Sequence, residues 1–105
     1  MAECQGIALV PIGRVDPIIL AWLKEDLPKG LSTSVTKTTP LPLTHRHLFK
    51  ERNQYLADGL LTELTTIIHD GNTLSLGITD ADIFSSGLNF VFGIATTGRA
   101  LISTF

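Results

Sequence analysis

The chain has 105 residues and a mass of 11.4 kDa, which fits one domain, residues 1–105, and not two. Its hydrophobic fraction is 44%, its charged fraction is 17% and its net charge is −2, values typical of a folded globular protein and not of a disordered one. The basic residues are scattered along the sequence, so we predict no nucleic-acid partner and no membrane partner.

The cysteine content and the first residues bear on the compartment. Cys4 is the only cysteine, which excludes an internal disulfide and a zinc site built from several cysteines of one chain. A reducing compartment is favoured for that reason. The start, MAECQGIALV, lacks the basic region and long apolar core of a signal peptide, and no apolar run approaches the ~20 residues that span a bilayer. We therefore expect a soluble, cytoplasmic protein.

The first two predicted elements are a buried strand and an amphipathic helix. Residues 6–11, GIALVP, form a continuous apolar run, as in strands that are buried on both faces. Asp16 and Pro17 predict a helix start, because aspartate is a good N-cap and proline suits the first helical position. We predict a helix over residues 16–27, ended by Pro28. Its apolar face comprises Ile19, Trp22, Leu23 and Leu27.

The middle of the chain predicts an exposed strand and a long helix. Residues 32–39, STSVTKTT, are rich in β-branched side chains, which favours a second strand that is more exposed than the first. Pro40 and Pro42 end this strand. A long helical pattern follows, so we predict a helix over residues 47–69, whose one apolar face comprises Leu56, Leu60, Leu64, Ile67 and Ile68.

Three strands are predicted to end the chain, over residues 73–79, 88–95 and 99–105. The turn at residues 96–98 makes the last two an antiparallel pair. The order β-α-β-α-β-β-β predicts an α/β fold with a single mixed five-stranded sheet, mostly parallel, with one antiparallel edge strand and two helices. If the fourth strand lies at the edge, residues 87–94, GLNFVFGI, form a free antiparallel edge.

The small number of helices leaves one face of the predicted sheet poorly covered. A sheet with an open apolar face normally packs against another element or another protein. We therefore expect a homo-oligomer, or a further segment of protein that covers this face.

The three histidines, His45, His47 and His69, offer limited chemistry. His45 and His47 are two residues apart and would not share a helical face. On a strand or loop they could pair on a metal, and the alternative is that both are ordinary exposed polar residues. His69, in the last turn of the predicted helix, would complement the helix dipole and bond a free carbonyl.

Two carboxylates, Asp80 and Asp82, follow the third predicted strand, where the loops of α/β sheets often carry function. They could hold a cation or act as an acid–base pair. The alternative is that both cap the loop through local backbone bonds. No other part of the chain supplies a complete catalytic set, since residues 85–87, SSG, lack the G-x-S-x-G frame and Cys4 has no evident base.

Three segments carry a resemblance to a known family: GIALVPIGRVDP, ERNQYLADGLLTEL and LGITDADIFSSGLNFVFGIATTGRALIST. They resemble the archaemetzincins, zinc-dependent peptidases of the metzincin clan, in the same order and over nearly the whole chain. The resemblance implies the N-terminal subdomain of a metzincin. In full-length members, a following helix with H-E-x-x-H and a third histidine binds zinc, and the glutamate is the general base. This sequence contains no H-E-x-x-H, so the resemblance assigns it no catalytic residue, no metal ligand and no cofactor of its own.

The resemblance does carry over a substrate-binding edge. In metzincins the antiparallel edge strand lines the active-site cleft, and an extended peptide adds to it as a further strand. The corresponding positions here are Gly87, Leu88, Asn89, Phe90, Val91, Phe92 and Gly93. Gly87 and Gly93 would let another backbone approach, and Asn89 would bond the loop or the bound chain. The alternative is an edge strand whose Phe90 and Phe92 only pack.

Three hypotheses remain open at this point. The chain is an archaemetzincin-like domain that ends before the catalytic motif, is inactive alone and keeps a peptide-binding edge. Alternatively it is a piece of an active enzyme, and its missing C-terminal half supplies the zinc. The third hypothesis is a self-associating or partner-binding α/β module with no peptidase role. The expected partners are a peptide or protein segment on the edge strand, and a second copy or the C-terminal half.

Overall fold

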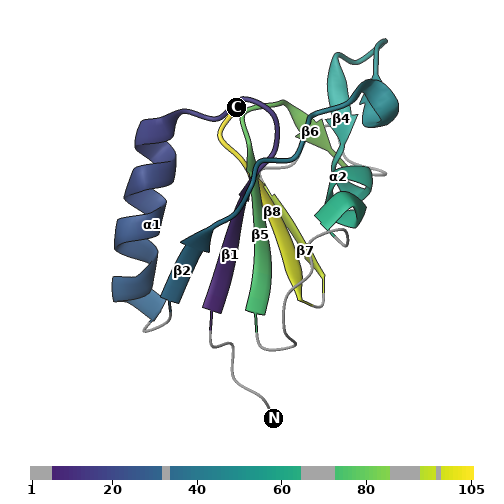
Figure 1. Ribbon diagram of the computed structural model, residues 1–105. Coiled ribbons are helices and arrows are strands. Elements are labelled where there is room, and N and C mark those ends of the chain that lie inside the picture. Colours follow the sequence, from purple (N-terminus) through teal and green to yellow (C-terminus); the bar gives the residue numbers. More distant parts are fainter. Residues whose placement is uncertain (1–5, 32–33, 65–72, 86–92, 97) are drawn as a thin grey trace.

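A five-stranded sheet with one helix on each face organises the computed structural model, which describes residues 6–31, 34–64, 73–85, 93–96 and 98–105 (Figure 1). The strand order is β2-β1-β5-β8-β7. The strands are β1 (Gly6–Pro11), β2 (Ser34–Lys37), β5 (Thr73–Thr79), β7 (Gly93–Thr96) and β8 (Arg99–Ser103). All neighbours are parallel except β7 and β8, which are antiparallel. The predicted fold class is confirmed, including the antiparallel strand at the edge.

Alternation along the strands divides the core into two clusters. On one face, Ile7 and Leu9 of β1 pack with Leu20 and Leu23 of helix α1 (Pro17–Leu31) and with Ile78 of β5. On the other face, β1 and β8 pack against helix α2 (Ala57–Glu63). The buried residues of this second cluster are Val10, Ile12, Ala57, Leu60, Leu61, Leu64, Ile83 and Leu101. β1 is thus buried on both faces, as its continuous apolar run predicted.

Helix α1 begins as predicted but ends later. The Oδ1 atom of Asp16 accepts a hydrogen bond of 2.9 Å from the backbone N–H of Ile18, which is the predicted N-cap. The helix continues through Pro28 to Leu31, so the prediction that Pro28 ends it is wrong. A proline within a helix removes one backbone hydrogen bond and does not forbid a further turn. The helix as a whole lies against β2, the strand that follows it.

Trp22 does not face the core, contrary to the prediction. Its side chain is 62% exposed, and Ile18, one turn earlier, is 77% exposed. Leu20 and Leu23 occupy the stripe that faces the sheet, and residues 18 and 22 lie away from that stripe at 100° per residue. The helix therefore carries an exposed apolar pair on its outer side.

The predicted helix over residues 47–69 is wrong in its first part. A short 3-10 helix η1 (His45–His47), a hairpin of β3 (Leu48–Phe49) and β4 (Gln54–Leu56) and then α2 (Ala57–Glu63) occupy this region. β4 also pairs in parallel with β6 (Ile83–Phe84), which makes a second sheet of order β3-β4-β6. Residues 65–72, and with them His69, lie outside the described residues.

The remaining boundaries differ by a few residues. The predicted strand over residues 32–39 is described as β2 (Ser34–Lys37), and the strand predicted to reach residue 105 ends at Ser103. Thr38 still donates its backbone N–H to the carbonyl of Leu9 at 2.9 Å, so hydrogen bonding between this segment and β1 continues one residue beyond the end of β2. In the part of the chain that is described, no helix has the length and hydropathy needed to cross a membrane.

The cap of α1 gives a direct test of this helix start. Replacing Asp16 by alanine removes the acceptor for the Ile18 N–H, and we expect the free energy of unfolding to fall by about 1 kcal/mol. Urea denaturation followed by circular dichroism measures this change. Asp26→Ala in the same helix is the matched control, because its ion pair with Lys29 is long, at 3.9 Å, and half-exposed. Equal losses in the two variants would contradict the capping role.

Candidate peptide-binding edge

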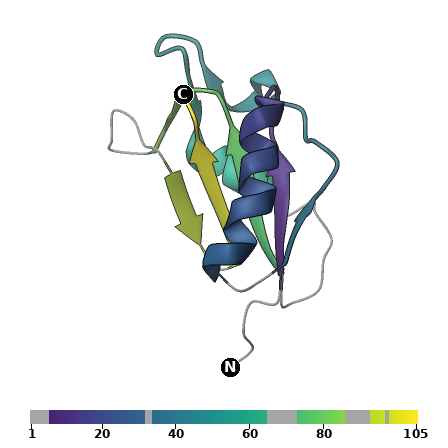
Figure 2. The ribbon, with the colours of Figure 1, turned by 90° about the vertical axis from the view of Figure 1, so that its left-hand side faces the viewer.

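β7 is the outer strand at one side of the main sheet (Figure 2). It pairs with β8 in the register Gly93↔Ile102, Ile94↔Leu101, Ala95↔Ala100 and Thr96↔Arg99. Only β8 pairs with it among the described strands. An edge strand presents on its free side a row of backbone N–H and C=O groups that can pair with another chain. This is the geometry that an added peptide strand requires.

Most of the predicted substrate-binding residues cannot be placed. Gly87, Leu88, Asn89, Phe90, Val91 and Phe92 lie outside the described residues, and Gly93 is the first residue of β7. Gly93 is exposed, but a side chain there would approach the carbonyl oxygen of Leu101 to 3.0 Å and the Ile102 Cγ2 atom to 3.3 Å. The small size of Gly93 therefore permits the close approach of β8, and its role toward a bound peptide stays a prediction.

The hairpin that presents β7 is tighter than predicted. The strands end at Thr96 and begin again at Arg99, so the connection has two residues and not the three of the predicted turn. Gly98 has φ = +76°, in the region that favours glycine and that two-residue hairpin turns require. Its carbonyl accepts a hydrogen bond of 3.0 Å from the Ser75 N–H of β5, which anchors the hairpin to the sheet. On the inner side, Ile94 packs against the α2 cluster.

The two histidines of η1 differ in their surroundings. His45 is exposed, while the His47 side chain is 18% exposed and its Nε2 lies 3.1 Å from Oε1 of Glu63. Arg46 contacts the same oxygen at 3.4 Å. The expectation of two exposed histidines is therefore wrong for His47, because the ring of His47 lies over α2 at Gly59. This cluster joins η1 to α2.

Of the two aspartates in the β5–β6 loop, Asp82 has a structural role. Oδ1 of Asp82 accepts a hydrogen bond of 3.1 Å from Nε2 of Gln54, and the Asp82 carbonyl accepts one of 2.9 Å from the Tyr55 N–H. Gln54 is buried, and its Oε1 accepts a bond of 2.9 Å from Nε of Arg52. Asp80 is exposed. The bonds of Asp82 are long-range ones to β4, and not the local backbone bonds of a loop cap.

The described residues do not fit a zinc ion. No group of three or more histidine, cysteine or carboxylate side chains comes together in these ranges. His47 and Glu63 contact each other, and Asp82 serves Gln54. Ser85, which has no serine-hydrolase frame in sequence, donates to Asp58 at 3.3 Å. Structural zinc sites have four ligands and catalytic ones at least three, so the described donor set is too small and too dispersed.

Curated relatives match the chain over most of its length. The archaemetzincin of Pyrococcus furiosus is 39% identical over 106 residues, which is 92% of this chain and 55% of the relative. That of Pyrococcus abyssi is 35% identical and that of Methanocaldococcus jannaschii 33%, with 94% and 98% of this chain covered. The chain spans only about 55–57% of the length of these relatives. No protein-family profile matches it.

Solved structures share the fold. The archaemetzincin of Archaeoglobus fulgidus, solved with malonate, superposes with a TM-score of 0.82 at 27% identity, over 95% of this chain and 61% of that one. The archaemetzincin of Methanopyrus kandleri gives 0.79 at 29%, over 94% and 57%. A zinc-dependent peptidase of Methanocorpusculum labreanum gives 0.69 at 25%, over 93% and 63%.

Fold and sequence thus agree on one class of protein. The mixed sheet with its antiparallel edge is the sheet of known archaemetzincin structures. The chain is a homologue of the archaemetzincins along most of its own length, which confirms the resemblance seen in the three sequence segments.

The contact between Gly59 and His47 predicts that Gly59→Ala lowers the free energy of unfolding of the wild-type protein but raises it when His47 is replaced by alanine. A Cβ atom at position 59 would overlap the His47 ring, so Gly59→Ala should displace the ring from Glu63 and destabilise the protein by about 1–2 kcal/mol. In a His47→Ala background the space is open, and the same substitution should stabilise α2 by up to about 1 kcal/mol because alanine is the better helix former. Urea denaturation of the four proteins measures both effects. Loss of stability in both backgrounds would contradict this contact.

Proposed function

We propose that this chain provides the sheet of an archaemetzincin-like zinc peptidase and binds an extended peptide along the edge that contains β7. The observation that carries the proposal is an open antiparallel edge in a fold shared with archaemetzincins. The relatives are longer than this chain, and the H-E-x-x-H motif is absent from its 105 residues. We therefore propose that the chain by itself binds peptide and does not hydrolyse it.

Binding by strand addition suits the local architecture. The strand behind the edge, β8, pairs with β7 on one side and with β5 on the other, so the edge is backed by paired strands. On the face of β7 that points away from α2, Gly93 and Ala95 are exposed and small, which leaves room beside the backbone. Main-chain hydrogen bonds would supply the affinity, and they require no particular side chain of the peptide. Residues 87–92 are part of the proposed edge by the family resemblance.

Hydrolysis would need groups that this sequence lacks. In zinc peptidases, three protein ligands hold the metal, and a carboxylate base acts on the attacking water. The described histidines and carboxylates are engaged in structural contacts or lie far apart. The catalytic part of the proposed enzyme therefore comes from outside these 105 residues.

Backbone methylation of the peptide tests the binding mode without altering the protein. An extended apolar peptide should bind, and the same peptide with the backbone nitrogens of both edges methylated should lose at least about 10-fold in affinity, since neither edge can then complete the strand ladder. Fluorescence anisotropy measures both affinities. The peptide methylated on one edge only is the matched control, because it can still pair through its unmethylated edge.

Incubation of the same peptide with the chain and zinc, followed by mass spectrometry, completes the test. We expect intact peptide and less than one bound zinc per chain. Equal binding of the unmethylated peptide and of the peptide methylated on both edges would rule out strand addition. Cleavage by the purified chain would overturn the assignment of catalysis to another segment.

A second candidate function, self-association, is favoured by a different observation. Ile18 and Trp22 are exposed on α1, and on the same face of the sheet Leu74, Leu76 and Ile102 are only partly buried. Single exposed apolar residues are common, but a large aromatic beside an aliphatic side chain one turn away is typical of a contact surface. This surface would receive a second copy of the chain or the remaining half of the peptidase.

Removal of the indole tests self-association. We expect the wild-type chain to sediment as an oligomer at high concentration, and Trp22→Ser to raise its dissociation constant by about 10-fold or more, because buried tryptophans dominate interface energies. Analytical ultracentrifugation measures the change. Lys24→Ser, at an exposed position of the same helix, is the control. A wild-type chain that remains monomeric at all concentrations would exclude this surface as a self-association site.

A further inference from the structure

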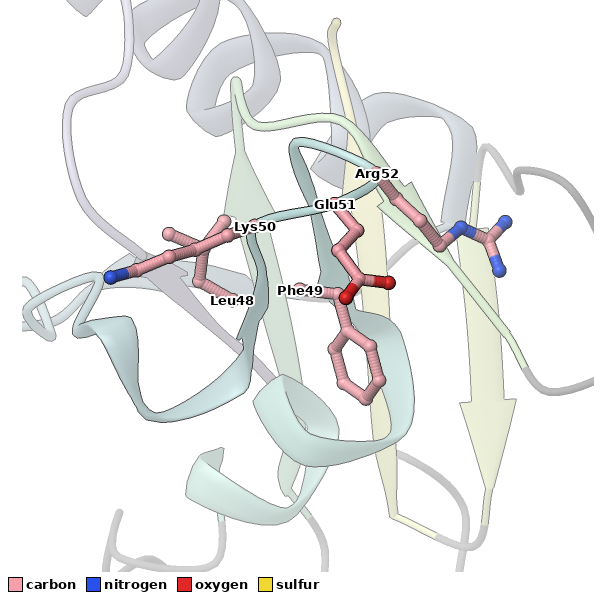
Figure 3. A pocket seen from close by; sticks show the side chains of 5 residues that line it. All are labelled: Leu48, Phe49, Lys50, Glu51 and Arg52. Atoms are coloured by element: carbon pink, nitrogen blue, oxygen red, sulfur yellow. The ribbon is translucent and has the colours of Figure 1, made fainter.

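The β3–β4 hairpin carries a surface hollow that the proposed edge strand does not use. Its lining residues are consecutive, Leu48, Phe49, Lys50, Glu51 and Arg52, and it encloses a volume of about 390 Å³ (Figure 3). A hollow of this size accommodates a side chain or two of a peptide. The sequence pattern does not reveal this hollow, because it predicts a helix over residues 47–69.

The turn of the hairpin fixes the backbone that carries these side chains. The N–H of Arg52 donates to the Phe49 carbonyl at 3.0 Å and that of Asn53 to the Lys50 carbonyl at 3.2 Å, and Asn53 has φ = 51°. Asparagine tolerates this left-handed conformation better than most residues, which favours the turn. Behind the turn, buried Gln54 links Arg52 to Asp82 of the β5–β6 loop. A backbone fixed in this way loses little conformational entropy when it binds.

An exposed aromatic ring forms the apolar part of the hollow. Phe49 is 49% exposed although it is a large apolar residue. Its ring meets the ring of buried Phe84 edge to face, with centroids 5.2 Å apart and an angle of 84°. The Arg52 guanidinium carbon lies 3.9 Å from the centroid of the same Phe84 ring. The remaining surface of Phe49 is therefore held in place and is available to a partner's apolar side chain.

Positive charge flanks this ring. In Figure 3, Lys50 and Arg52 extend to opposite sides of the hairpin, with Phe49 and Glu51 between them. Lys50 is exposed and forms no ion pair within the described part of the chain. Arg46, just before the hairpin, contacts Glu63 of α2 at 3.4 Å, so the cations of the hairpin itself are Lys50 and Arg52, beside the one acid Glu51.

We propose that residues 48–52 form a second binding surface, which takes an acidic segment of a peptide or protein partner. An apolar side chain of the partner packs on Phe49, and its carboxylates lie near Lys50 and Arg52. Complementary charge at the rim of such a contact raises the association rate and favours partners of the opposite charge. This surface is separate from the β7 edge, so its existence does not depend on strand addition.

An acidic peptide suits the surface better than a nucleic acid. Glu51 lines the hollow. Because a nucleic acid carries a phosphate at every nucleotide, it would place a negative charge near the Glu51 carboxylate however it bound. A peptide can place a neutral residue there. Nucleic-acid surfaces also extend over many cations, and the described hairpin supplies few.

A labelled glutamate-rich peptide with one leucine is the probe, compared with a lysine-rich peptide of the same length and with a single-stranded oligonucleotide. We expect the acidic peptide to bind at least about 10-fold more tightly than the basic one at low salt, and this preference to shrink when salt rises to about 0.5 M. Equal affinities for the two peptides, or tightest binding by the oligonucleotide, would overturn the proposal.

Single substitutions on the hairpin locate the site. Lys50→Gln should weaken acidic-peptide binding about three-fold and Glu51→Gln should strengthen it by a similar factor, because each removes one rim charge of opposite sign. Phe49→Ser should weaken binding further, through lost apolar contact. Lys24→Gln on α1 is the matched control, with the same change of charge at a remote exposed position.

Lys50→Gln and Glu51→Gln are expected to change the affinity in opposite directions, so a general loss of stability cannot explain both results. Circular dichroism of each variant confirms that the hairpin substitutions leave the fold intact. If Lys50→Gln and Lys24→Gln weaken binding equally, the peptide responds only to overall charge and the proposed surface does not exist. The variants should not alter the effect of backbone methylation on the apolar peptide, which separates this result from the fate of the β7 edge.

Discussion

The pairing of β1 with two parallel neighbours is the constraint on which the fold depends. Its residues alternate between the two clusters, so one strand of six residues supplies the centre of both. Leu9 and Val10 are fully buried on opposite faces. Because both faces of β1 must be covered, α1 lies on one and α2 on the other, and the antiparallel β7 is left at the far side of the sheet.

The hydrogen bonds of the buried Gln54 side chain are a second constraint on the fold. Gln54 is one of few buried polar side chains among the described residues, and it joins the hairpin turn to the loop that follows β5. Buried polar groups need partners, so the bonds to Arg52 and Asp82 fix the register of the small sheet as well as its place above the main one. The aromatic contacts of Phe84 add to the same junction. The hairpin surface therefore rests on elements that are anchored at more than one point.

Local patterns in the sequence predicted the parts of the fold that depend on local chemistry. The apolar run of β1, the aspartate cap of α1 and the tight turn before β8 were recognised because each has its own residue signature. Leu60 and Leu64 were correctly expected on a buried helical face. The start of that helix was missed, since residues 48–53 contain no glycine or proline and the turn depends on Asn53 in a left-handed conformation.

The candidate sites were less predictable than the fold. The edge position of β7 follows from strand order, which a single sequence constrains weakly, and the family resemblance supplied the residues of the proposed edge. The hairpin hollow depends on the packing of Phe49 against Phe84, residues 35 positions apart that only the tertiary structure brings together. Trp22 was misplaced because helical spacing defines a broad apolar stripe and not its centre.

The position of β5 beside β1 also sets the order in which the chain can mature. Gly6 pairs with Thr73, so β1 cannot pair with β5 until more than half of the sequence has been synthesised. During synthesis, the apolar segment from Ile7 to Val10 must remain without that partner while the ribosome supplies the residues between. Parallel pairing across such a separation is slow to form. The same strand that stabilises the finished sheet is, in the nascent chain, an apolar segment that other unfolded chains can contact.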